Sequence, residues 1–200
     1  MPAKDDVTIA FYAEQASAYT TRGQVAQKHR LDQFLSHVAP GGSVLELGCG
    51  AGQDSEYMLA RGFDVTPTDG TPEIAHAAAV RLGRLVDVLL FEDIEAREAY
   101  DGVWANACLL HVPRANLSAI IGRIHRALKP GGVFYASFKA GKAEGRDQFD
   151  RYYNYPSADW LEQTYRPGPW ESVGIEAAKG GGYDNKPTDW LYVLARKSMP

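Results

Sequence analysis

The sequence has few residues that could cross-link the chain or hold a metal ion. Cys49 and Cys108 are the only cysteines among 200 residues, so no disulfide framework is predicted, and both are expected to be reduced packing residues. They form no recognisable zinc pattern with the histidines, so no metal site is expected. The histidines are His29, His37, His76, His111 and His125. No set of residues resembles a nucleophilic triad.

Long hydrophobic runs and an excess of basic residues are also missing. The longest apolar stretches have the length of strands, and residues 1–6 lack the apolar core of a signal peptide, so a cytoplasmic protein without membrane association is expected. The net charge is −4 and the pI is near 5.7, and no basic stripe offsets this balance. Nucleic acid is therefore disfavoured as a partner, and a small-molecule substrate is the simpler expectation.

Composition and hydrophobic spacing favour one α/β domain over residues 1–200. With 45% hydrophobic and 23% charged residues, the chain is long enough for one well-packed α/β domain but too short for two comfortable ones. Apolar residues at helical spacing predict helices, and short apolar runs predict strands. The predicted helices are residues 6–20, 25–39, 55–61, 74–82, 116–128 and 157–164. The predicted strands are residues 43–47, 63–66, 86–91, 100–105, 133–138, 172–178 and 189–196.

A glycine-rich turn separates the first predicted strand from a predicted helix. Gly48, Gly50 and Gly52 alternate along this turn. Strand, glycine-rich turn and helix in this order begin a nucleotide-binding unit, where a ligand lies close to a backbone without Cβ atoms. The dinucleotide pattern would need a small residue at the position that Gln53 occupies. This difference disfavours an NAD-dependent oxidoreductase, although that alternative shares the glycines.

The second predicted strand ends in an acidic residue about twenty positions after the turn. Asp69 at this place can accept hydrogen bonds from both hydroxyl groups of a ribose. In these features the chain resembles the class I S-adenosylmethionine (SAM) dependent methyltransferases, and the resemblance covers roughly residues 40–140. The matching segments are residues 46–52, Asp69, and residues 91–94, 100–104 and 128–133.

The resemblance implies a fold and a division of the chain. The expected fold is Rossmann-like and doubly wound, with a mostly parallel seven-stranded sheet, an antiparallel last strand and helices on both faces. Residues 1–39 would form a helical lid, residues 40–140 the cofactor-binding core, and residues 141–200 an acceptor-side loop and the C-terminal strands. A monomer or a homodimer is expected.

The resemblance also implies which residues bind SAM. The glycine-rich turn and Asp69 carry the motif, and an acid and an apolar residue after the third strand would bind adenine. Asp93 could instead cap a short helix over residues 95–99, and Arg22 could be an exposed arginine rather than a partner of the SAM carboxylate. The expected cofactor-binding residues are Tyr19, Arg22, Glu46, Gly48, Cys49, Gly50, Gly52, Asp69, Gly70, Thr71, Asp93, Ile94, Asn106 and Ala107.

The acceptor is expected beside the fourth strand and the long loop after residue 139. His111 has an ordinary pKa near 6.5 and could take a proton from the acceptor, or it could only shape the pocket. Lys139 or Arg146 could meet a carboxylate of a planar or anionic acceptor. Tyr12 and Tyr152 complete the predicted substrate-binding residues, although aromatic residues there could also serve only packing.

The expected activity is methyl transfer from SAM to an oxygen, nitrogen or sulfur atom of a small molecule. Because SAM carries an activated methyl group, the protein mainly needs to align the reactants in a dry pocket. A thiol or metalloid-oxyanion acceptor, as in the tellurite-resistance type, is the main alternative. A non-catalytic SAM-binding protein remains a second one.

Overall fold

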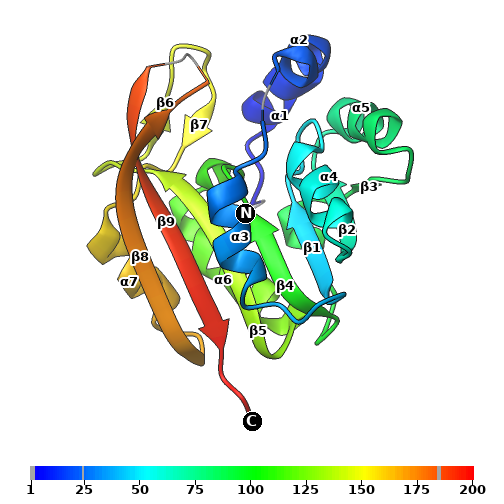
Figure 1. Cartoon of the computed structure of the whole chain (residues 1–200). Coiled ribbons are helices and arrows are strands. Elements are labelled where there is room, and N and C mark those ends of the chain that lie inside the picture. The colour runs from blue at the N-terminus through cyan, green and yellow to red at the C-terminus, as the bar shows by residue number, and fades with distance from the viewer. Residues whose placement is uncertain (1–2, 24, 184–185) are drawn as a thin grey trace.

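The computed structural model describes residues 3–23, 25–183 and 186–200, and its centre is a seven-stranded sheet (Figure 1). The strands are β1 (Ser43–Leu47), β2 (Asp64–Asp69), β3 (Asp87–Val88), β4 (Tyr100–Ala105), β5 (Leu128–Lys139), β8 (Trp170–Gly181) and β9 (Pro187–Lys197). Their order across the sheet is β3-β2-β1-β4-β5-β9-β8. The pairs among β1 to β5 are parallel, whereas β9 runs antiparallel to both β5 and β8. This confirms the predicted doubly wound sheet with an antiparallel last strand.

Helices cover both faces of the sheet, as predicted. They are α1 (Asp6–Glu14), α2 (Ala16–Thr21), α3 (Lys28–Leu35), α4 (Gln53–Ala60), α5 (Pro72–Leu82), α6 (Arg114–Ala127) and α7 (Ala158–Tyr165), with short 3-10 turns η1 (Phe91–Asp93) and η2 (Leu109–His111). Within the described ranges, no helix is long and apolar enough to cross a membrane.

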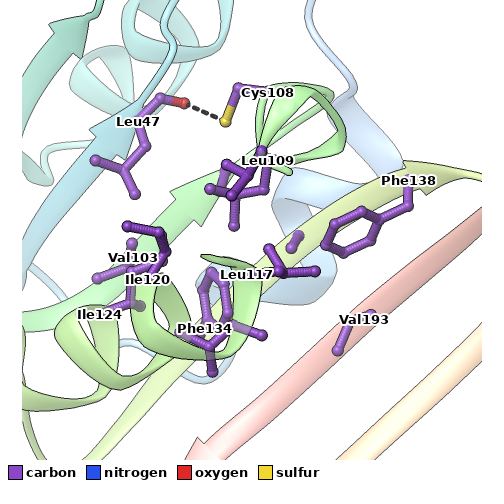
Figure 2. Close-up of a cluster of buried hydrophobic side chains, with 14 of the residues drawn as sticks. Leu47, Val103, Cys108, Leu109, Leu117, Ile120, Ile124, Phe134, Phe138 and Val193 are labelled. Atoms are coloured by element: carbon purple, nitrogen blue, oxygen red, sulfur yellow. Dashed lines mark hydrogen bonds between the residues drawn. The ribbon is translucent and has the colours of Figure 1, made fainter. Parts of the chain in front are cut away.

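Alternating strand residues build a separate hydrophobic core on each face. One core joins α6 and α7 to inward residues such as Val103 and Phe134, and Figure 2 shows α6 lying against this layer. The other core joins α3 and α4 to strand residues that face the opposite side of the sheet. These include Trp104 and Tyr135, whose ring centres lie 3.9 Å apart in a stacked arrangement. Because these strands are apolar on both faces, they form the buried centre of the sheet, and their carboxyl ends meet at one edge.

A small hairpin lies at this carboxyl edge, inside the segment predicted as a long loop. It pairs β6 (Gly145–Arg146) with β7 (Tyr152–Tyr153) in antiparallel orientation. Figure 1 shows β6 and β7 at the same end of the sheet as α1 and α2. The acceptor-side segment and the N-terminal helices therefore enclose the same end of the sheet.

Four predicted elements differ from the structure. The helix predicted over residues 6–20 is interrupted at Gln15, whose backbone leaves the helical region (φ −96°, ψ 7°). The helix predicted over residues 25–39 contains only Lys28–Leu35. The third strand has two exposed residues, because it pairs only with the last two residues of β2 at the sheet edge. No helix forms over residues 95–99.

Candidate functional site

The glycine-rich turn leaves β1 in a conformation that requires glycine. Gly48, Gly50 and Gly52 all have positive φ angles, of 64°, 57° and 82°. At Gly48 a Cβ atom would lie 2.5 Å from the Cβ of Cys108, so packing as well as backbone conformation excludes a side chain. The thiol of Cys108 in turn donates a hydrogen bond to the carbonyl of Leu47 at 3.1 Å (Figure 2). The turn is thereby fixed between β1 and the segment after β4.

Asp69 at the end of β2 points at the glycine-rich turn. Its carboxylate accepts hydrogen bonds from the amides of Gly50 at 3.1 Å and Thr71 at 2.9 Å. Burial raises the pKa of Asp69 to about 6, and these two N–H groups lessen the rise. The side chain is 8% exposed, so a ligand in front of the turn would meet a carboxylate that is mostly ionised at neutral pH.

A first cavity, of about 90 Å³, opens in front of Asp69. It is lined by residues of α1, α2, the glycine-rich turn, the start of α5 and the segment 89–92. Glu92 carries a buried Oε2 atom in this cavity with no hydrogen-bond partner among the described residues. An unpaired buried acceptor is costly, and a ligand that donates a hydrogen bond here would satisfy it.

A second cavity, of about 380 Å³, lies on the other side of the turn. Charged groups of both signs line it: Arg22, Lys139 and Arg151 contribute positive charge, and Glu46 and Asp54 contribute acidic groups. Tyrosines from α1, α2, β7 and the turn between β8 and β9 supply flat apolar surfaces. This cavity can therefore hold a planar molecule that carries negative charge at one end.

The two cavities meet at a shared wall. Residues that line both are Tyr12, Tyr19, Gly48, Gly50, Ala107 and His111. Ala107 has a positive φ of 54°, which is strained for a residue other than glycine, and its N–H is held by the Ser137 hydroxyl at 2.8 Å. A ligand that reaches across this wall would present one end to each cavity.

Hydrogen bonds define the protonation of His111 at this wall. Its Nδ1 lies 2.6 Å from the carbonyl oxygen of Tyr152, which can only accept, so Nδ1 carries the proton. Burial, together with the cations Arg151 and Lys139, lowers the pKa of His111 to about 4, so the ring is neutral at pH 7 and Nε2 is an acceptor. The hydroxyl of Tyr12 donates to this Nε2 at 3.0 Å.

Arg151 is a buried cation surrounded by aromatic rings. It is 1% exposed, and its guanidinium lies 4.4 Å from the ring centre of Tyr183 and 4.9 Å from that of Phe11. Asp147 accepts two of its hydrogen bonds, at 2.6 and 3.1 Å, and a third goes to the Tyr12 hydroxyl at 3.1 Å. The chain thus holds a permanent positive charge beside the shared wall.

Asp54 is the centre of a second buried network. Its carboxylate accepts hydrogen bonds from the backbone of Gln27 at 3.1 Å, the indole of Trp104 at 3.0 Å and the amide of Asn106 at 3.2 Å. Nearby, Glu46 accepts a hydrogen bond from the Ser55 hydroxyl. Burial raises the pKa of both carboxyl groups. A positively charged group of a ligand would be stabilised at this end of the second cavity.

The structure places most of the predicted site residues at the cavities. Gly70 and Thr71 join Asp69 at the first one, and the shared wall contains four further cofactor candidates. Those at the second cavity or the shared wall are Tyr12, Tyr19, Arg22, Glu46, Gly48, Cys49, Gly50, Asn106, Ala107, His111 and Lys139. Their roles in binding remain predictions, but their positions bring them together.

Three cofactor candidates lie away from the cavities. Asp93 ends the 3-10 turn η1 and is exposed, whereas its neighbour Glu92 reaches the first cavity. Ile94 is buried in the core against α6, and its carbonyl accepts a hydrogen bond from Arg123. Gly52 begins α4, and its nearest neighbour is the Leu82 side chain rather than a cavity. The acidic side chain that reaches the first cavity is thus that of Glu92, one residue before the predicted Asp93.

Two substrate candidates also occupy other positions. Arg146 pairs with Asp5 at 2.7 Å on the surface, whereas Arg151 lines the second cavity. The hydroxyl of Tyr152 donates to Glu144 at 2.5 Å, outside both cavities, and it is the Tyr152 carbonyl that contacts His111. The hairpin register explains both corrections, because Arg146 pairs with Tyr152 and the next residue on β7, Tyr153, faces the cavity.

Asp54, Glu92 and Arg151 are the main site residues that the sequence interpretation missed. Asp54 directly follows the glycine-rich turn, so its position in the first turn of the helix was a usable signal. Glu92 is adjacent to the predicted acid. Nothing in the sequence distinguishes the buried Arg151 from the exposed Arg146. Among the described residues, no group of three or more His, Cys, Asp or Glu side chains could hold a metal ion, and both cysteines are buried and free.

The fold and the cavities at the carboxyl edge define a Rossmann-like α/β protein whose candidate site lies at the carboxyl ends of the parallel strands. Residues 45–136 match the family described as methyltransferase domain. An uncharacterized methyltransferase of Synechocystis is 35% identical over 108 residues, covering 53% of this chain and 51% of that protein. A ubiquinone biosynthesis O-methyltransferase of Xanthomonas campestris is 40% identical over 118 residues, covering 54% and 48%. Residues 45–136 of this chain are thus similar to methyltransferase domains.

Solved structures with low sequence identity share the fold. A Burkholderia thailandensis 1,6-didemethyltoxoflavin-N1-methyltransferase, solved with its acceptor and S-adenosylhomocysteine, has a TM-score of 0.77 at 22% identity, covering 96% of this chain and 88% of that one. Magnesium protoporphyrin IX methyltransferase from Synechocystis, with bound SAM, has a TM-score of 0.71 at 18% identity, covering 98% and 99%. The chain spans about half the length of the curated relatives it matches.

Proposed function

We propose that this chain transfers a methyl group from SAM to a small-molecule acceptor. The observation that supports this most directly is the meeting of two chemically different cavities at the glycine-rich turn. The first offers carboxylates suited to adenosine, and the second offers cations and aromatic rings suited to a planar anion. An oxygen acceptor is favoured over nitrogen or sulfur, because a relative is named as an O-methyltransferase.

The described residues fit SAM. The unpaired Glu92 Oε2 would accept a hydrogen bond from the adenine amine, and Asp69 would accept bonds from the ribose hydroxyls. Glu46 and Asp54 would face the ammonium group of the methionine part. Arg22, which stacks 4.2 Å from the Tyr183 ring at the second cavity, would face its carboxylate.

The proposed chemistry depends mainly on alignment. When bound, SAM supplies a methyl group on a positively charged sulfur, so no covalent intermediate with the protein is needed. Tyr12 and Tyr19 stand at the shared wall with their ring centres 5.2 Å apart, where they would exclude water from the methyl group. His111 and Arg151 would orient the acceptor from the second cavity.

Each part of the chain has its own role in the proposed methyl transfer. Residues 1–200 form one domain, in which residues 1–39 act as the lid, residues 40–140 as the cofactor-binding core, and residues 141–200 as the acceptor side. We propose a cytoplasmic protein, a monomer or a homodimer, that acts on a small molecule and not on nucleic acid, in keeping with its net charge of −4.

Parallel calorimetric titrations with SAM, S-adenosylhomocysteine and NAD test the cofactor. Binding of the two adenosyl-sulfur compounds without NAD supports the proposal, and binding of NAD alone contradicts it. Methyl transfer from labelled SAM to a phenol, an amine, a thiol and tellurite would then identify the acceptor atom. Methylation of the thiol or tellurite only would favour the thiol or metalloid alternative.

A further inference from the structure

The hydroxyl of Tyr12 occupies an unusual position for a residue of the lid. It donates a hydrogen bond to His111 Nε2 at 3.0 Å and accepts one from Arg151 at 3.1 Å. Both partners line the second cavity, and His111 also lines the first. A phenol of the chain itself therefore lies between an acceptor nitrogen and a fixed cation, at the wall where the two cavities meet.

The direction of these hydrogen bonds defines what the position recognises. Because the Nδ1 proton of His111 is held by the Tyr152 carbonyl, Nε2 can only accept from the hydroxyl. The guanidinium of Arg151 can only donate to it. The position thus requires a group that donates one hydrogen bond and accepts another, and the nearby positive charge favours a group that can become an anion.

The surroundings select against other acceptors. A protonated amine would be repelled by Arg151, because its guanidinium is permanently charged and the residue is only 1% exposed to solvent. The walls of the position are aromatic, with Tyr153 4.6 Å from the His111 ring and Tyr183 4.4 Å from the Arg151 guanidinium. These contacts suit a flat ring that carries an acidic hydroxyl group.

We infer that the acceptor is a phenol or a similarly acidic enol whose oxygen binds between His111 Nε2 and Arg151, in the position that the Tyr12 hydroxyl holds in this structure. Tyr12 then serves as an internal mimic of the substrate, and its hydroxyl gives up this position when the acceptor enters. This inference rests on the proposed methyl transfer and adds the substrate class and the residues that recognise it.

This placement allows direct transfer of the methyl group from SAM to the acceptor oxygen. A lone pair of the acceptor oxygen forms the new C–O bond while the C–S bond of SAM breaks and its electron pair stays on the sulfur. The proton of the acceptor hydroxyl passes to His111 Nε2 and later to water. Arg151 stabilises the negative charge that develops on the oxygen, which offsets the low proton affinity of His111.

Tyr12→Phe is the matched test, because it removes only the competing hydroxyl and keeps the ring contacts with Phe11 and Tyr19. Binding of p-cresol is measured calorimetrically, with and without S-adenosylhomocysteine, against toluene as the analogue without a hydroxyl. We expect p-cresol to bind Tyr12→Phe about threefold to tenfold more tightly than the wild type, since the two hydrogen bonds of the Tyr12 hydroxyl no longer compete. Toluene should bind both proteins equally weakly.

Tyr165→Phe serves as the control, because this core hydroxyl has no hydrogen-bond partner among the described residues. It should leave p-cresol binding unchanged. Equal or weaker p-cresol binding by Tyr12→Phe, or equal binding of p-cresol and toluene by the wild type, would overturn the inference. If S-adenosylhomocysteine binds and only an amine or thiol is methylated, the inference fails while methyl transfer stands. If S-adenosylhomocysteine does not bind, the proposed function fails, and the p-cresol titration without it still tests the hydroxyl position.

Discussion

The carboxylate of Asp69 accepts a hydrogen bond from the amide of Gly50, which lies 19 positions earlier in the chain. This bond joins the end of β2 to the turn after β1, and it closes the back of the first cavity. The same carboxylate is also the acceptor proposed for the ribose. One side chain therefore orders the glycine-rich turn and, in the proposed function, would also recognise the ribose.

Asp69→Ala is expected to weaken SAM binding by about 2–4 kcal/mol, or roughly 30- to 900-fold, since hydrogen bonds to a charged group are worth about 1.5–3 kcal/mol each. Calorimetric titration with SAM measures the loss. Asp64→Ala is the control, because Asp64 is an exposed residue at the opposite end of the same strand. Unchanged SAM affinity in Asp69→Ala would refute the ribose assignment.

SAM affinity is also expected to fall as the pH drops through about 6, where the Asp69 carboxyl becomes protonated and loses acceptor strength. The stability of the protein should change in the opposite direction. The folded pKa lies above the usual 3.8, so between these values the folded state binds more protons, and this contribution to stability is lost as the pH rises through about 6. Calorimetric titrations with SAM at several pH values measure the affinity, and urea unfolding at the same pH values measures the stability. Asp69→Asn should remove the pH dependence of the affinity and of the stability. A pH-independent affinity in the wild type would contradict the assignment.

The meeting of the glycine-rich turn with Asp69 was predictable because its signals are local. Gly48 and Gly50 mark a turn that only glycine can adopt, and Asp69 ends a strand that must lie next to the first. Parallel strands bring such ends together regardless of the rest of the sequence. The strands β1 and β4 were also predicted correctly, because each contains a short cluster of buried apolar residues, as expected of parallel strands covered on both faces.

The acceptor side was less predictable because it depends on contacts between distant segments. Arg151 reaches Tyr12 across 139 positions, and no local pattern distinguishes it from Arg146. The two-residue hairpin that decides between them is too short for a periodic signal. Likewise, the break at Gln15 divides a stretch whose apolar spacing is continuous.

Gly48→Ala should destabilise the fold by about 2–4 kcal/mol, which combines the strain of a positive φ with overpacking. The new Cβ would lie 2.5 Å from the Cβ of Cys108. Gly62→Ala is the matched control: its φ is 84°, but no atom lies within 4 Å of the added Cβ, so only the backbone strain of about 1–2 kcal/mol applies. Urea unfolding measures both, and equal losses would show that the Cys108 contact relaxes.

Arg151→Met should lower stability by about 3–5 kcal/mol, because it leaves Asp147 as an unpaired, mostly buried charge. Arg146→Met removes an exposed ion pair and should cost at most about 1 kcal/mol. The double variant Arg151→Met/Asp147→Leu should regain much of the loss, since neither charge then remains buried. Urea unfolding of the three variants measures these effects, and a double variant no more stable than Arg151→Met would show that the charge pair itself is not the cause.

Asp54→Asn tests the network that links the start of α4 to β4. The carboxylate accepts from three donors, on Gln27, Trp104 and Asn106. The asparagine amide has only one oxygen that can accept, and its NH2 group would face a donor. At least one of the three buried hydrogen bonds is therefore lost, which should lower the free energy of unfolding by about 1–3 kcal/mol. Asp159→Asn is the control, because Asp159 also lies in the first turn of a helix but is exposed. If unfolding free energies show equal losses in both variants, the effect comes from the helix dipole, and the three donors do not depend on the Asp54 charge.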